Sequence, residues 1–135
     1  MKVLIADGSP EIADRLLSML QEIPAAETLS PTHTAAATLE AVRTYNPDIL
    51  IADARIPGAQ GTALLRTLRA EKPAMVLIVL SNLIYPQYRD QFEAAGADLI
   101  VDKSNEFIHL SQIIRSLMCR PQSPGVEGRI DSRAP

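Results

Sequence analysis

Four polar side chains stand directly or closely behind four apolar runs of this 135-residue sequence, and their types suit one kind of chemistry. They are, each with the apolar run before it in parentheses, Asp7 (3–6), Asp53 (49–52), Ser81 (75–80) and Lys103 (99–101). A carboxylate can attack phosphorus as a nucleophile, while a cation and a hydroxyl group stabilise the phosphoryl oxygens. Asp53 alone would be interpreted as a solvated loop carboxylate. The four strand ends together predict phosphoryl chemistry, provided that the fold gathers them.

The apolar runs and the segments between them predict alternating strands and helices. Short runs without polar alternation are typical of strands buried on both faces of a parallel sheet. Strands are expected at residues 3–6, 25–29, 49–52, 75–80 and 99–101, and the weak run 25–29 suits a sheet edge. Helices are expected to begin at Pro10 after the cap Ser9, after Thr32 or Thr34, near Gly61, near Pro86 and after the cap Ser104.

Apolar side chains at helical spacing predict the faces that pack on the sheet. These faces are Ile12, Leu16, Leu20 and Ile23; Ala35, Leu39 and Val42; Leu64, Leu65 and Leu68; Tyr85, Tyr88, Phe92 and Ala95; and Phe107, Leu110, Ile114 and Leu117. Gly96 suits the left-handed conformation in which many helices end. The strict alternation of strands and helices predicts an α/β fold.

The expected architecture is a doubly wound, five-stranded parallel sheet with helices on both faces, in the flavodoxin-like strand order 2-1-3-4-5. This order places the first and third strands side by side at the switch point. The carboxyl edge would then gather Asp7, Asp53, Ser81 and Lys103. Two neighbouring carboxylates require a compensating cation, which a divalent metal or Lys103 would supply.

Composition narrows the class of protein. Apolar residues make up 47% and charged residues 21%, which is ordinary for one soluble globular domain, and the net charge of −3 argues against a nucleic-acid-binding face. Cys119 alone allows neither an internal disulfide nor a thiolate metal site, so a reducing cytoplasm is the expected location. No run is long enough to span a membrane. The shift to Pro, Gly and Ser predicts a domain at 1–119 followed by a flexible tail at 120–135.

The chain resembles the receiver domains of two-component response regulators, the CheY-like family, over residues 2–118. The matching pieces, in the family's order, are residues 3–7 with 10–12, residues 47–53 with Pro57, Gly58 and Gly61, residues 79–81, and residues 95–98 leading to Lys103. No single piece is specific, and the resemblance depends on their combination.

The resemblance implies a role for each matching polar residue. Asp53 would accept a phosphoryl group, and Asp7, Asp53 and the backbone carbonyl of Arg55 would hold Mg²⁺. Ser81 and Lys103 would contact the phosphoryl oxygens. The phosphoryl donor would be a histidine kinase or a histidine phosphotransferase. Output would pass through the face of the fourth helix, fifth strand and fifth helix to a partner protein, with a homodimer left open and no nucleic acid or membrane involved.

Three positions depart from the family pattern. Gly8 replaces a second acid that commonly touches the metal, and Glu11 is a weak candidate to replace it. Ile100 stands where the family has its switch aromatic, an aromatic residue that moves between a buried and an exposed position. Tyr85 or Tyr88 could take over that role, although ordinary packing in the core is the alternative for both. Ser104 replaces the proline after the lysine.

Two hypotheses of function therefore stay open within the family, and one outside it. The first is a stand-alone phosphorylatable receiver. The second is a pseudo-receiver that binds partners without phosphorylation, favoured by Gly8 and Ile100. A cofactor-binding flavodoxin-like protein or an aspartate phosphatase is disfavoured because no phosphate-cradling loop follows the first strand. Arg55 also has two possible interpretations: its guanidinium either approaches the phosphoryl site or is solvated. The two histidines, His33 and His109, are expected to be surface residues rather than metal ligands.

Overall fold

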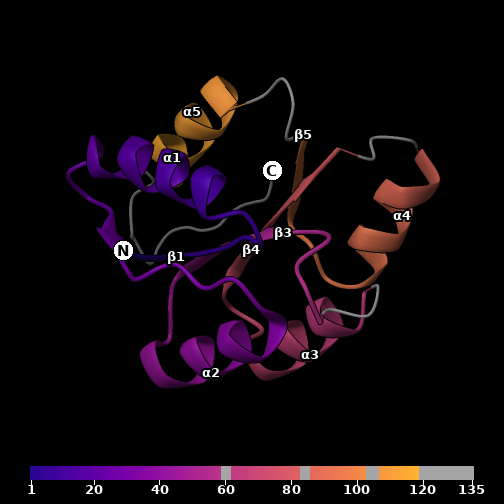
Figure 1. The fold of residues 1–135 in the computed structure, drawn as a ribbon. Coiled ribbons are helices and arrows are strands. Elements are labelled where there is room, and N and C mark those ends of the chain that lie inside the picture. Colours follow the sequence, from indigo (N-terminus) through magenta and orange to yellow (C-terminus); the bar gives the residue numbers. More distant parts are fainter. Residues whose placement is uncertain (59–61, 83–85, 103–106, 119–135) are drawn as a thin grey trace, which may run out of the picture.

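The computed structural model describes residues 1–58, 62–82, 86–102 and 107–118 (Figure 1). The elements, in chain order, are β1 (Lys2–Ala6), α1 (Pro10–Gln21), β2 (Glu27–Thr28), α2 (Ala35–Tyr45), β3 (Ile49–Asp53), α3 (Ala63–Glu71), β4 (Val76–Ser81), α4 (Pro86–Ala94), β5 (Leu99–Asp102) and α5 (Phe107–Met118). Several predicted features lie outside the described residues: Lys103, the cap Ser104, Tyr85, Gly61, Cys119 and the proposed tail. The side chains of Phe107 and His109 also lie outside them.

Within the described residues, the strands form one five-stranded sheet in the order β2-β1-β3-β4-β5, and every pairing is parallel. The central pair runs in register from Val3↔Ile49 to Ala6↔Ala52. The predicted fold class and strand order are therefore confirmed. Because every strand runs the same way, all five carboxyl ends lie at one edge of the sheet.

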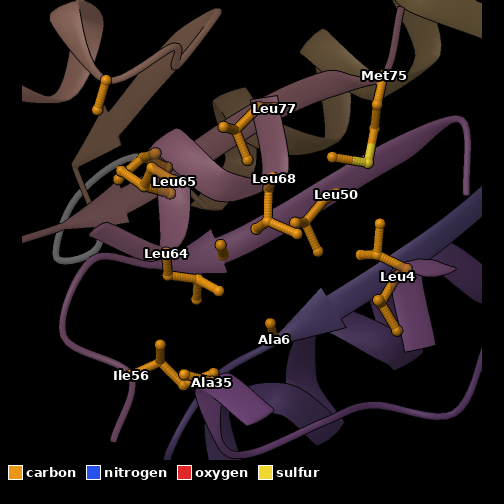
Figure 2. Packing of buried hydrophobic residues seen from close by; sticks show 14 of the residues in the cluster. Leu4, Ala6, Ala35, Leu50, Ile56, Leu64, Leu65, Leu68, Met75 and Leu77 are labelled. Atoms are coloured by element: carbon orange, nitrogen blue, oxygen red, sulfur yellow. The ribbon is translucent and has the colours of Figure 1, made fainter. Parts of the chain in front are cut away.

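Alternate residues of the central strands feed two separate cores, one on each face of the sheet. One face carries Leu4, Leu50 and Leu77 toward α2, α3 and α4, and Figure 2 shows Leu64, Leu65 and Leu68 of α3 packing there. The other face carries Ile5, Ile51 and Ile78 toward α1 and α5. Figure 1 shows α1 and α5 on one side of the sheet and α2 and α3 on the other. Burial on both faces explains why the strands are continuously apolar.

Local signals fix where the helices begin and end. Ser9 accepts the N–H of Ile12 as the cap of α1, with Pro10 in the first turn. Thr34, rather than Thr32, caps α2 by accepting the N–H of Ala37, and Asn46 ends that helix with a φ of 50°. Gly96, after α4, has a φ of 114°, in the positive range expected for it.

The second strand is shorter than predicted. It spans Glu27–Thr28, whereas residues 25–29 were expected. The ladder is interrupted because Pro31 has no N–H to donate, and pairing resumes as an isolated bridge between Thr32 and Ala6. After this interruption, Thr32 and His33 lie across the carboxyl end of β1, where both contact the backbone of Asp7.

Candidate functional site

Asp7 and Asp53 are brought together by the pairing of β1 with β3. Ala6 and Ala52 are register partners, and each carboxylate residue directly follows one of them. Neighbouring strands lie about 4.8 Å apart, so the two residues end adjacent strands at the switch point. Asp7 is fully buried and Asp53 is half-buried. This juxtaposition agrees with the expectation from the sequence.

Asp7 is held by backbone contacts on several sides. Its N–H donates to the carbonyl of Thr32 at 3.0 Å, and its Oδ1 accepts the N–H of Ser9 at 2.8 Å. The ring Nδ1 of His33 lies 2.8 Å from the carbonyl oxygen of Asp7. His33 is exposed, as expected, but this contact with the site was not predicted. Its only signal in the sequence was its place in the loop after the second strand.

Asp53 begins the loop that carries its own neighbours. Its Oδ1 accepts the N–H of Arg55 at 3.2 Å, an Asx-type turn that sets the direction of the loop. The N–H of Ala54 donates to the carbonyl of Leu80 at 2.9 Å and so ties the loop to β4. The side chain of Arg55 is exposed, which agrees with the solvated interpretation of its guanidinium.

Ser81 and Asp102 complete the edge on the next two strands. They are register partners at the ends of β4 and β5, and both are buried, at 2% and 8% exposure. Ser81 lies one residue beyond Leu80, the register partner of Asp53, which agrees with the expected location. Asp102 was not among the predicted site residues, yet it is a second buried acid near this edge, after Asp7. Lys103, the residue after it, lies outside the described residues.

The missing second acid leaves a position that Pro57 fills. A Cβ on Gly8 would lie 2.7 Å from Pro57 Cδ, closer than real contacts allow, and 3.3 Å from Pro57 Cγ, which is tight. The loop is anchored there, because the carbonyl of Pro57 accepts the N–H of Ala35 at 2.8 Å. Glu11, the weak candidate to replace the acid, is exposed in the first turn of α1. The pocket is therefore built around Asp7 and Asp53.

The donor set fits a hydrated Mg²⁺ and not a fully protein-ligated metal. In the described parts of the chain, no group of three or more His, Cys, Asp or Glu side chains is placed to hold a metal ion. Two adjacent carboxylates are nevertheless the usual protein contribution to Mg²⁺, which keeps several waters. A carboxylate as buried as Asp7 also favours a compensating cation nearby.

The position of the family's switch aromatic is part of the ordinary core. Ile100 is half-buried and packs against the cluster on the α2–α4 face of the sheet, as Tyr88 of α4 does. The packing interpretation of Tyr88 therefore agrees with the structure. Leu99, the neighbour of Ile100, is exposed on β5 between α4 and α5.

The structure is thus a parallel α/β domain that carries two carboxylates and a buried serine at the carboxyl edge of its sheet. A family model described as the response regulator receiver domain matches residues 3–115. The chain belongs to that family. The cofactor-binding and phosphatase interpretations are thereby set aside.

Relatives and solved structures agree with this assignment. A protein-glutamate methylesterase/protein-glutamine glutaminase of Rhodopseudomonas palustris is 29% identical over 138 residues, covering 100% of this chain and 38% of the relative. A second, from Myxococcus xanthus, is 28% identical over 79 residues, covering 58% of this chain and 22% of the relative. The chain thus spans well under half the length of these curated relatives.

Solved receiver domains share the fold. The isolated receiver domain of RcsB from Salmonella enterica serovar Typhimurium, in the presence of phosphomimetic BeF3⁻, has a TM-score of 0.80 and 22% identity, covering 87% of each chain. The receiver domain of Francisella response regulator 1452 has a TM-score of 0.73 and 25% identity, covering 86% of this chain and 97% of that one. None of the helices in the described parts of the chain is long and apolar enough to cross a bilayer.

Proposed function

We propose that this receiver domain, residues 1–119, accepts a phosphoryl group on Asp53 and signals by contact with other proteins. The observation that carries the proposal is the placement of Asp53 beside buried Asp7, one strand away from buried Ser81, at the carboxyl edge of the sheet. Asp53 is half-buried and so remains open to a donor, whereas Asp7 is enclosed.

The chemistry is a displacement at phosphorus. A carboxylate oxygen of Asp53 attacks the phosphorus of a phosphohistidine, and the new O–P bond forms as the P–N bond breaks. The freed imidazole of the donor takes up a proton. The Ser81 hydroxyl is the group that would hydrogen-bond a phosphoryl oxygen from β4, and Lys103 would supply a cation from the end of β5. Hydrolysis of the acyl phosphate restores Asp53.

Mg²⁺ fits this edge as a resident ion, with Asp7, Asp53 and the carbonyl of Arg55 as the groups that would hold it. When bound, it neutralises charge on the phosphoryl oxygens. The Oδ1 of Asp7 is oriented by the N–H of Ser9. With two carboxylates in place of three, we expect weaker Mg²⁺ binding than a three-acid pocket gives.

The partners follow from the chemistry and from the exposed surface. The donor is a histidine kinase or a histidine phosphotransferase. The output face is formed by α4, β5 and α5, where Leu99 is an exposed apolar side chain at 36% exposure. A partner bound to this face would lie beside the strand that ends at Ser81, because β5 pairs with β4.

The test is phosphorylation by acetyl phosphate with and without Mg²⁺, followed by intact-mass measurement. The wild type should gain a phosphoryl group only with Mg²⁺, and Asp53→Asn should gain none. Asp90→Asn, which changes an exposed carboxylate of α4, is the matched control and should behave as wild type. A folded wild type that stays unmodified at every Mg²⁺ concentration would reject the proposal.

That negative result would support the alternative function, a pseudo-receiver that binds its partner without phosphate. The position of Pro57 is the observation that favours it, because the proline ring occupies the space where a side chain at position 8, and so a second acid, would begin. In that case, Asp53→Asn would leave partner binding unchanged, whereas substitution of Leu99 by Glu would weaken it.

A further inference from the structure

The loop between β2 and α2 contacts Asp7 from a side that the proposed function does not use. His33 lies in this loop, with Nδ1 2.8 Å from the carbonyl oxygen of Asp7. A carbonyl oxygen can only accept, so Nδ1 must carry the hydrogen and donate it. His33 is therefore a side-chain donor aimed at the backbone of a candidate metal-binding residue.

Threonines on either side hold His33 in place. Thr38 is fully buried and donates its hydroxyl hydrogen to the carbonyl of Thr34 at 2.7 Å. The hydroxyl of Thr32 lies 2.8 Å from that of Thr38 and must be the donor there, since Thr38 has only one hydrogen to give. The backbone of Thr32 also bonds to both Ile5 and Asp7. The loop is thus fixed before and after His33.

These contacts restrain the two peptide planes that flank the α-carbon of Asp7. The plane before it is held through the N–H of Asp7, which donates to Thr32. The plane after it is held through the carbonyl, which accepts from His33. That second plane leads into Gly8, a residue type that restrains its neighbours least. The hydrogen bond from His33 therefore restrains the Asp7–Gly8 peptide, which the glycine at position 8 does not do.

We propose that His33 is a positioning residue for Asp7. Its hydrogen bond fixes the peptide between Asp7 and Gly8, and with it the orientation of the Asp7 carboxylate toward a divalent cation beside Asp53. Polar groups around metal ligands commonly set ligand orientation and metal affinity in this way. The proposal rests on the proposed function for the role of Asp7 as a ligand.

Two amide variants separate the hydrogen bond from the bulk of the side chain. The amide nitrogen of Asn occupies the place of Nδ1, and that of Gln occupies the place of Nε2. His33→Asn should therefore keep Mg²⁺ affinity near the wild-type value. His33→Gln and His33→Ala should weaken Mg²⁺ binding about fivefold, the effect of one lost neutral hydrogen bond. Calorimetric titration with Mg²⁺ alone measures this difference.

A second readout needs no metal and keeps this proposal distinct from the proposed function. The amide of Ser9 bonds to Asp7 Oδ1, so its NMR shift and hydrogen exchange report the carboxylate orientation in metal-free protein. It should change in His33→Gln and stay unchanged in His33→Asn. If the wild type binds no Mg²⁺, the proposed function fails while this pattern still supports positioning. A Ser9 amide that is identical in all variants would overturn the proposal.

Discussion

The ring of Pro57 stands where a side chain on Gly8 would begin. A Cβ at position 8 would lie 2.7 Å from Pro57 Cδ, which is fixed to the backbone and cannot rotate away. The carbonyl of Pro57 is in turn bonded to Ala35 at the start of α2. The absence of a second acid is therefore part of the loop's packing, and restoring the acid requires a change in the loop as well.

Gly8→Ala should lower the free energy of unfolding by about 1–3 kcal/mol, the usual cost of overpacking. Pro57→Ala removes Cγ and Cδ, so Gly8→Ala should cost much less in that background. Urea unfolding of the four proteins of this double-mutant cycle gives the coupling. If the two changes in the free energy of unfolding simply added, Pro57 would not be the reason that a side chain at position 8 is destabilising.

Thr38→Val should destabilise the protein by about 1–2 kcal/mol, because it removes a buried hydroxyl and leaves that of Thr32 without this acceptor. Thr44→Val makes the same change at an exposed position of α2 and should stay within about 0.5 kcal/mol of wild type. Chemical unfolding compares the two. Equal effects would mean that the loss comes from helix propensity and not from the hydroxyl network.

Arg69→Lys should cost about 1–3 kcal/mol although the charge is kept. The guanidinium of Arg69 donates to the carbonyls of Gly96 and Met75 and pairs with Asp98 at 2.6 Å, contacts that one ammonium group cannot reproduce. Arg66→Lys, at an exposed position of the same helix, is the control. Thermal unfolding of both variants measures the difference, and similar melting temperatures would contradict the prediction.

The pKa of Glu71 lies below its ordinary value because its carboxylate accepts hydrogen bonds from Arg43, with the positive charge of Arg43 adding to the effect. A depressed folded-state pKa means that the pair's contribution to stability is present above the unfolded pKa and lost as the pH falls through the folded value. Arg43→Gln should therefore raise the pKa of Glu71. A carboxyl carbon NMR titration tests this, and Arg43→Lys should give a smaller rise because it keeps the charge.

The fold was predictable because local signals and long-range patterns agreed. Continuous apolar runs gave the buried parallel strands, and Ser9 with Pro10 marked the start of α1 correctly. The bounds of β2 were not predictable, because Leu29 and Thr32 still bond to β1 on either side of Pro31. Whether those residues count as strand depends on tertiary pairing and not on propensity.

The site was predictable only in part. The strand ends predicted that Asp7, Asp53 and Ser81 lie at one edge of the sheet, because parallel strands bring their carboxyl ends together. The contact of His33 depends on how the loop after β2 folds back over β1, which no periodicity encodes. The packing of Pro57 on Gly8 likewise involves residues that are distant in the sequence.

The neighbouring positions of β1 and β3 in the sheet have a consequence for folding kinetics. These two strands are separated in the chain by α1, β2 and α2, so their pairing closes a long loop. Contacts of this kind slow folding because the loop entropy is lost before the contacts form. Asp7 and Asp53 therefore meet only after this closure, and a nascent chain that ends before β3 has one carboxylate of the pair without the other.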